Sequence, residues 1–215
     1  MAEIAAALRQ AIERRAAEGS AGGMAARVLA RGEGWSVINV MCTSGPGDRS
    51  FEEQHRNFSV ALVAAGSFQY RSTAGRALLT PGSVMLANAG ERFECGHALG
   101  AGDRCISFSY TPEYFQQLTG TTRFRAAALP PIRAMSSVLA RSCAGLFGQP
   151  DALAWEELGV QMAVETARLV HGNALTAETV PSAEARVTRV VRMMEASPAA
   201  RHSVAALAKE ARLSP

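Results

Sequence analysis

The chain has 215 residues, of which 48% are hydrophobic and 19% are charged, and its net charge at pH 7 is +3. This length allows one full hydrophobic core and a smaller appended unit, and the composition is that of a globular protein rather than a disordered or fibrous one. No run approaches the roughly 20 apolar residues that cross a membrane, and the N-terminus lacks the basic start of a secretory signal. The slight positive charge does not by itself indicate nucleic-acid binding.

The four cysteines have no regular spacing, which argues against a disulfide scaffold in a chain of this size. They are Cys42, Cys95, Cys105 and Cys143. We therefore expect a cytoplasmic protein with reduced thiols and no contact with a membrane.

The chain should begin with a helix followed by two strands. Ile4, Leu8 and Ile12 have helical spacing between residues 2 and 18, which predicts an amphipathic helix within an N-terminal arm over 1–24. We expect this helix either to pack on the fold or to contact a second copy of the chain. Residues 26–30 and 35–41 have strand-like composition, the second being rich in valine and isoleucine.

Two strand blocks that open with a glycine, 47–66 and 82–97, form the centre of the sequence. Between them, residues 68–79 predict a hairpin whose turn holds 73–75. A last strand is expected over 104–110, where Cys105 and Ser107 alternate with Ile106 and Phe108. The tripeptide Gly102-Asp103-Arg104 predicts a turn with an Asp–Arg pair at the start of this strand.

The spacing of the two blocks resembles the cupin family, whose small antiparallel β-barrel has a glycine-framed motif in each block. Gly47, His55 and Gly66 fit the first motif, and Gly82, Gly90 and His97 fit the second. The resemblance implies metal ligands at four positions, but Glu53, Ser59 and Phe93 stand at three of these, and His55 alone is kept. The frame therefore predicts a cupin-like barrel over residues 25–111 that binds a ligand and does not catalyse a reaction.

Helices are expected after the barrel. Thr111 and Pro112 predict the cap and first turn of a helix over 112–118. Pro131 should open a second helix and Asp151 should cap a third, together forming a helical segment over 112–172. The third helix carries more apolar positions than one packing stripe needs, so we expect the second and third helices to support a homodimer.

Residues 173–184 lack a sustained period and predict a linker, followed by a final unit over 185–215. A helix is expected over 186–196, and a second helix should follow the cap residue Ser203. With Ser214-Pro215, this pattern resembles the first part of the helix-turn-helix in AraC-family transcription regulators. The resemblance implies that the recognition helix would come next, so we expect a truncated domain without specific DNA binding. Three basic residues could supply weak, salt-sensitive phosphate contact: Arg201, Lys209 and Arg212.

Strand alternation and the cupin frame predict a set of inward-facing or mouth-lining side chains around one effector cavity. The expected lining is Glu53, His55, Tyr70, Arg71, Phe93, Cys95, His97 and Cys105, with Cys42 nearby. Arg71 and Tyr70 are placed at the barrel mouth, where they could orient an anionic ligand. Thiolate and imidazole suit zinc or a softer ion, and the candidate ligands are His55, Cys95, His97 and Cys105. The alternative is an organic pocket in which the cysteines are apolar fillers.

The sequence therefore predicts a β-plus-α protein: a cupin-like antiparallel barrel, a helical dimerisation segment and a helix-turn-helix fragment. As function, we expect the effector-sensing and dimerisation region of an AraC-type regulator, a non-enzyme that binds a small molecule or metal effector. Promoter DNA is expected as a partner only for a longer chain. The alternative is a metal-dependent cupin enzyme, such as a dioxygenase or isomerase.

Overall fold

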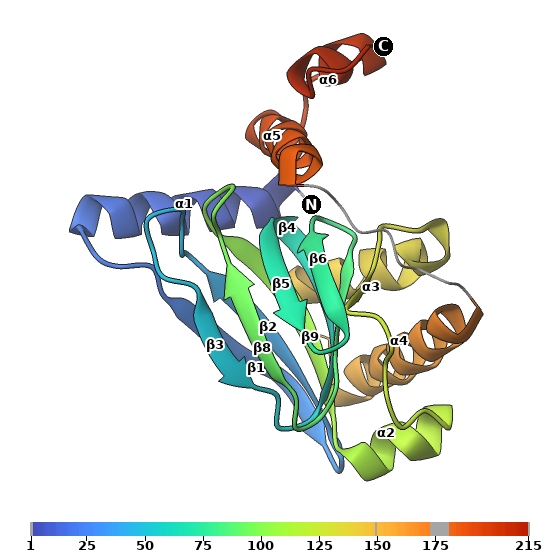
Figure 1. The fold of residues 1–215 in the computed structure, drawn as a ribbon. Helices are drawn as coiled ribbons and strands as arrows, with labels where there is room; N and C mark the ends of the chain where they lie inside the picture. Colours follow the sequence, from blue (N-terminus) through green and yellow to red (C-terminus); the bar gives the residue numbers. More distant parts are fainter. Residues whose placement is uncertain (1, 149, 173–180, 215) are drawn as a thin grey trace.

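A computed structural model describes residues 2–148, 150–172 and 181–214. Two antiparallel sheets face each other, with helices outside them (Figure 1), which confirms the predicted fold class. The larger sheet contains, in order across it, β1 (Met24–Gly32), β2 (Trp35–Cys42), β9 (Asp103–Tyr110), β4 (Phe58–Gly66), β7 (Val84–Ala87) and β10 (Ala128–Leu129). The smaller sheet contains β3 (Phe51–Gln54), β8 (Arg92–Gly96), β5 (Phe68–Ser72) and β6 (Gly75–Leu79).

Strand β4 shows why the larger sheet has two buried faces. All nine of its residues are buried. Val60 and Leu62 belong to the core on the helix side, whereas Ala61 and Val63 belong to the core between the sheets. Successive side chains of a strand point to opposite faces, so a strand that is covered on both sides reads as a continuous apolar run. The space between the sheets is thus lined by alternate residues of the central strands.

Four helices and a short 3₁₀ turn cover the larger sheet or its ends (Figure 1). They are α1 (Ala2–Glu18), α2 (Pro112–Thr119), the 3₁₀ turn Arg133–Met135, α3 (Ser136–Gly148) and α4 (Ala152–Gly172). Ile4 and Leu8 of α1 are buried in the core, which confirms packing as a role of the N-terminal helix. None of the helices in the described ranges is both long and apolar enough to cross a membrane.

The start of α2 carries the predicted cap. Thr111 has extended backbone, and its hydroxyl oxygen accepts a hydrogen bond from the backbone N–H of Tyr114. We expect Thr111→Ala to lower the free energy of unfolding by about 1 kcal/mol, because that N–H loses its partner at the helix end. Chemical denaturation of both proteins checks this value. Thr111→Ser keeps the hydroxyl and should stay close to wild type; an equal loss in both variants would contradict the capping argument.

Three predicted boundaries were wrong. The second helix does not open at Pro131, because a 3₁₀ turn precedes α3, which begins at Ser136. The barrel does not end at 111, because β10 returns from the helical segment to pair with β7. The C-terminal end of the predicted linker is helical, since α5 (Pro181–Ala196) begins inside it; residues 173–180 lie outside the described residues.

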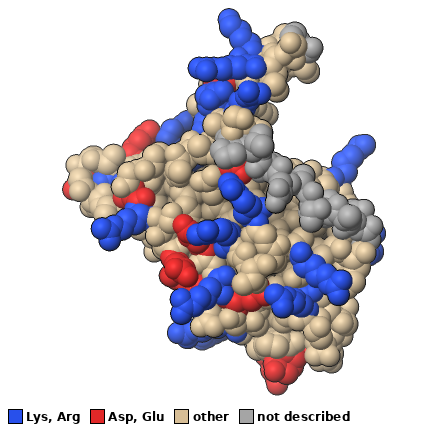
Figure 2. All heavy atoms as spheres, viewed as in Figure 1, with Lys and Arg blue, Asp and Glu red and all other residues tan. Residues whose placement is uncertain are grey.

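Helix α5 contacts the barrel through several polar groups. The backbone N–H of Gly66 donates to Glu195 at 2.6 Å, and Gln69 donates to Glu184 at 2.8 Å. Arg192 donates to the carbonyl oxygen of Gly102 at 3.0 Å, in the loop between β8 and β9. The final helix, α6 (Val204–Glu210), begins at the predicted cap Ser203. Basic side chains gather on these two helices, at the top of the molecule in Figure 2.

The glycine that closes the first motif has a backbone that other residues rarely adopt. Gly66 has φ +75°, and a Cβ atom there would lie 2.2 Å from the carbonyl oxygen of Gly102. Both facts require glycine, since a left-handed φ is strained for other residues. The motif frame therefore marks the point where β4 ends against the loop that leads into β9.

Candidate functional site

A cavity of about 170 Å³ lies between the two sheets. Most of its lining is apolar, with Val40, Phe51, Phe68, Met85 and Phe93 among the lining residues. Its polar groups come from β4, β9 and the ends of neighbouring strands: Cys42, Glu53, His55, Ser59, Cys95, Asp103, Cys105 and Ser107. Five of the eight predicted effector-binding residues therefore line one cavity: Glu53, His55, Phe93, Cys95 and Cys105.

The positions at which cupins place a metal do not fit a metal here. Ser59 exchanges a hydrogen bond of 2.9 Å with Ser107 across β4 and β9. Phe93 stacks on the imidazole of His55 with ring centroids 3.8 Å apart, and the Nε2 of that histidine lies 3.2 Å from the hydroxyl of Tyr70. A single imidazole, already engaged by an aromatic ring and a phenol, does not make a ligand set.

His55 is neutral at pH 7 in this environment. Burial lowers the pKa of its imidazole from 6.5 to about 4, although the carboxylate of Glu91 acts in the opposite direction. Burial also raises the pKa of Tyr70 above its usual range, so the phenol keeps its proton. His55 and Tyr70 are therefore uncharged hydrogen-bonding groups in the space between the two sheets.

Acid should destabilise the protein through His55. Between pH 6.5 and 4 the unfolded chain binds a proton at this residue and the folded chain does not, so the free energy of unfolding falls as the pH falls. We expect His55→Phe to flatten this part of the stability curve by about 1 kcal/mol, a value reduced for the partial exposure of the ring. Urea denaturation from pH 7 to pH 4 measures it. His55→Gln should flatten the curve similarly, and parallel curves for all three proteins would contradict the assignment.

Two predicted lining residues lie elsewhere. Tyr70 is buried in the core between the sheets, and its hydroxyl is 3.3 Å from the carbonyl oxygen of Leu86. Arg71 points to solvent on the other face of β5 and pairs with Glu94. Neighbouring residues of a strand point to opposite faces, and neither side chain lines the cavity between the sheets. The predicted placement of Tyr70 and Arg71 at this cavity was therefore wrong.

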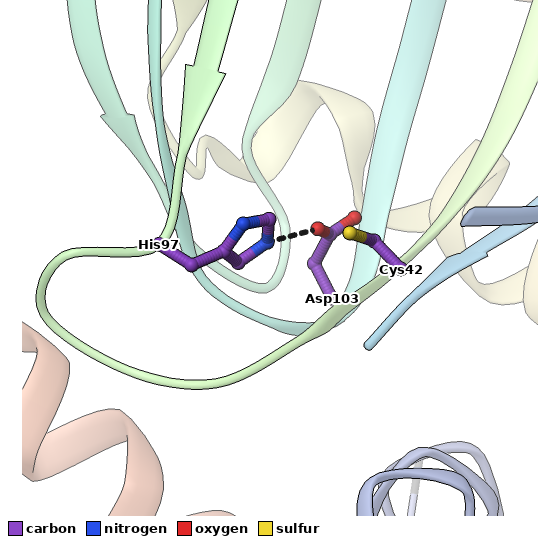
Figure 3. A group of neighbouring side chains, drawn as sticks. All are labelled: Cys42, His97 and Asp103. Carbon is purple, nitrogen blue, oxygen red and sulfur yellow. Dashed lines mark hydrogen bonds and ion pairs between the residues drawn. The ribbon is translucent and has the colours of Figure 1, made fainter. Parts of the chain in front are cut away.

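His97, the last predicted residue, belongs to a second cluster next to the cavity (Figure 3). Its Nε2 lies 2.7 Å from Oδ1 of Asp103, and both side chains are buried. The Sγ of Cys42 completes a group of three ligand atoms that all lie within 4.8 Å of one another. The thiol of Cys105 donates to Oδ2 of Asp103 at 3.2 Å. Residues from β2, β9 and the end of β8 thus meet at one edge of the barrel.

The electrostatics of this cluster keep His97 charged. Burial lowers the pKa of the imidazole, but the hydrogen bonds and the negative charge of Asp103, together with Cys42, outweigh it and raise the pKa to about 9. At neutral pH the cluster is therefore an ion pair between His97 and Asp103. Burial, followed by the charge of Asp103, raises the pKa of both Cys95 and Cys105, so both thiols are protonated.

The predicted metal set is only partly brought together. Among the described residues, the group with ligand atoms in mutual reach joins His97 to Cys42 and Asp103, not to His55, Cys95 and Cys105. Asp103 was expected to pair with Arg104 in a turn; instead Arg104 donates to Asn39 at 2.9 Å. The alternation of Asp103 with Cys105 and Ser107 could have revealed the inward direction of the carboxylate. The predicted DNA contacts Arg201, Lys209 and Arg212 are exposed on or beside α6.

Comparison with solved structures returns matches that cover part of this chain. A cupin superfamily protein from Desulfitobacterium hafniense is 13% identical, with a TM-score of 0.35 over 41% of this chain and 78% of that chain. KdgF from a Halomonas species is 17% identical (TM-score 0.35, 41% and 79%). The DMSP lyase DddQ from Ruegeria pomeroyi is 14% identical (TM-score 0.36, 40% and 46%). A search of curated proteins finds no significant match.

A family model gives the decisive match. The model described as the AraC-like ligand binding domain matches residues 43–163, which is more than half of the chain. The matched range begins directly after Cys42 and runs through the cavity-lining strands into α4. The chain therefore belongs to the AraC-like ligand binding domain family.

Proposed function

We propose that this chain is the effector-sensing region of an AraC-type transcription regulator, that it is not an enzyme, and that its effector occupies the cavity between the sheets. The observation that carries the proposal is this cavity, because most of its lining residues belong to the part of the chain that matches a ligand-binding domain. Ligand sites are typically concave and mostly apolar, with a few polar groups that fix orientation. Helices α5 and α6 would be the start of the DNA-binding part, and α4 would support a homodimer.

The cavity restricts the chemistry of the effector. A cavity of about 150 Å³ accommodates a benzene ring, so one of about 170 Å³ suits a molecule with a single ring. Its ionisable lining includes the carboxylates of Glu53 and Asp103 together with the neutral imidazole of His55. Arg71, the cation expected at its mouth, points to solvent. An uncharged or cationic aromatic molecule is therefore favoured over an anion.

Two of the contacts between α5 and the barrel offer a route from the cavity to the C-terminal helices. Glu195 accepts from Gly66 at the end of β4, and Arg192 donates to Gly102 directly before Asp103. Ser59 of β4 and Asp103 of β9 both line the cavity. A ligand that binds one arrangement of these strand ends more tightly would bias the position of α5, which is the requirement for coupling two sites.

Binding can be tested with four probes of similar size: phenol, benzyl alcohol, benzylamine and benzoate. Isothermal titration calorimetry and ¹H–¹⁵N spectra should show binding of an uncharged or cationic probe and weaker binding of benzoate. Ala61→Leu fills the cavity and should abolish binding, whereas Ala140→Leu, on the exposed face of α3, should not. Preference for benzoate, or binding unaffected by Ala61→Leu, would contradict the site.

The regulatory part needs a separate experiment. Transcript levels in the source organism should change when the chromosomal gene carries Ala61→Leu, compared with a strain that carries Ala140→Leu. Unchanged transcripts in both strains would argue against regulation while leaving ligand binding intact. Turnover of a bound probe by the purified protein would instead support the enzyme alternative.

A further inference from the structure

We propose that Cys42, His97 and Asp103 form a binding site for zinc or a similar thiophilic divalent ion at the edge of the barrel. The three ligand atoms are a sulfur, an imidazole nitrogen and a carboxylate oxygen, all within 4.8 Å of one another. These are the ligand types that zinc selects in proteins. The site differs from the positions that cupins use, which here hold Glu53, His55, Ser59 and Phe93.

The geometry of His97 and Asp103 requires only a small adjustment. Two ligand atoms at about 2.1 Å from zinc in a tetrahedral arrangement are about 3.4 Å apart. His97 Nε2 and Asp103 Oδ1 are now 2.7 Å apart, so they would separate by about 0.7 Å to admit the ion. All three side chains lie at strand ends, two of them opposite each other in the register of β2 and β9. His97 is the first residue of the loop that leads from β8 to β9 (Figure 3).

The charges also balance. A thiolate at Cys42 and the carboxylate of Asp103 would supply two negative charges to a doubly charged ion, and the imidazole of His97 would add a neutral ligand. The occupied site would therefore avoid a buried net charge, which is costly.

Cys105 is not one of the three ligands, but it forms a hydrogen bond with Asp103, which is one of them. Its thiol donates to Oδ2 of Asp103 at 3.2 Å, which directs the other carboxylate oxygen toward His97. Such outer contacts orient metal ligands and tune their affinity. With three protein ligands, the fourth tetrahedral position stays open, as in zinc sites that bind an exogenous group. Because Cys42 and Asp103 also line the cavity, that open position can face its contents.

The test is zinc binding by the tag-free protein, reduced with a phosphine and stripped of metal by a chelator that is then removed. In competition with a chromophoric chelator we expect one zinc ion per chain. Cys42→Ser and Asp103→Asn should each weaken binding by at least about 100-fold, the upper range for losing a supporting contact. Cys95→Ser and Cys143→Ser are matched controls and should bind as wild type does. Loss of binding in Cys95→Ser, or unchanged binding in Cys42→Ser, would overturn the site.

Cobalt substitution keeps the proposal testable even if a variant fails to fold. Co²⁺ bound to the wild type should give a thiolate-to-cobalt charge-transfer band in the near ultraviolet and the intense visible bands of a tetrahedral ion. Cys95→Ser should retain both and Cys42→Ser should lose the first. A wild-type spectrum without a thiolate band rejects the site irrespective of the variants. The site does not depend on the regulatory function, because none of these measurements involves DNA or an organic effector.

Discussion

Trp155→Ala is expected to lower the free energy of unfolding by about 4 kcal/mol, the range measured for removing a large buried aromatic side chain. Trp155 is 2% exposed and joins α4 to the larger sheet, where its ring centroid lies 6.4 Å from that of Phe108. Gly145 of α3 approaches the same ring so closely that a Cβ atom there would lie 2.8 Å from it. The substitution leaves a cavity that three elements border and that none can fill by moving alone.

Guanidinium denaturation monitored by circular dichroism measures this loss. In a chain of this size, 4 kcal/mol corresponds to a decrease of about 8 to 16 °C in the melting temperature. Leu153→Ala is a control on the same helix, because this leucine is 73% exposed; its change should stay within about 0.5 kcal/mol. A loss below about 1 kcal/mol for Trp155→Ala would show that α4 is not anchored through this ring.

The elements that sequence reasoning found are those with a clear local signal. The hairpin over 68–79 corresponds to β5 and β6, because bulky strands flank a glycine turn. Asp151 caps α4 by accepting from the backbone N–H of Ala154 at 2.8 Å, as its position before an apolar period predicts. By contrast, β10 has two residues, which are too few to show an alternating pattern of apolar and polar side chains. It forms by pairing with the edge of β7.

The candidate site was predictable only in part, and the reason is the distance along the chain between its members. The alternation of side chains along β8 and into the next residue correctly predicted that Cys95 and His97 point inward, where both are buried. The partners of these two side chains depend on the register of β2 and β9, which places Cys42 opposite Asp103. No local sequence pattern encodes a pairing between residues about 60 positions apart. The misplacement of Arg71 had another cause, since alternation along β5 already directs it away from the core between the sheets, where Tyr70 is buried.

Asp103→Ala is expected to destabilise the metal-free protein by about 3 kcal/mol, measured with a chelator present. The carboxylate is 5% exposed and is the partner of both His97 and the thiol of Cys105. Removing one member of a buried ion pair leaves the other charge without compensation, which costs more than the pair itself contributes.

A double-mutant cycle distinguishes this mechanism from simple loss of packing. His97→Ala should also destabilise, because it leaves the Asp103 carboxylate buried beside Cys42 without its cation. The double variant Asp103→Ala/His97→Ala removes both charges and should be more stable than the sum of the single losses predicts, by about 2 kcal/mol. Additive losses would mean that the two side chains act independently and that the ion pair does not hold the loop from 97 to 103 against β2. If the coupling is found, the ion pair stabilises the loop that Arg192 of α5 contacts at Gly102.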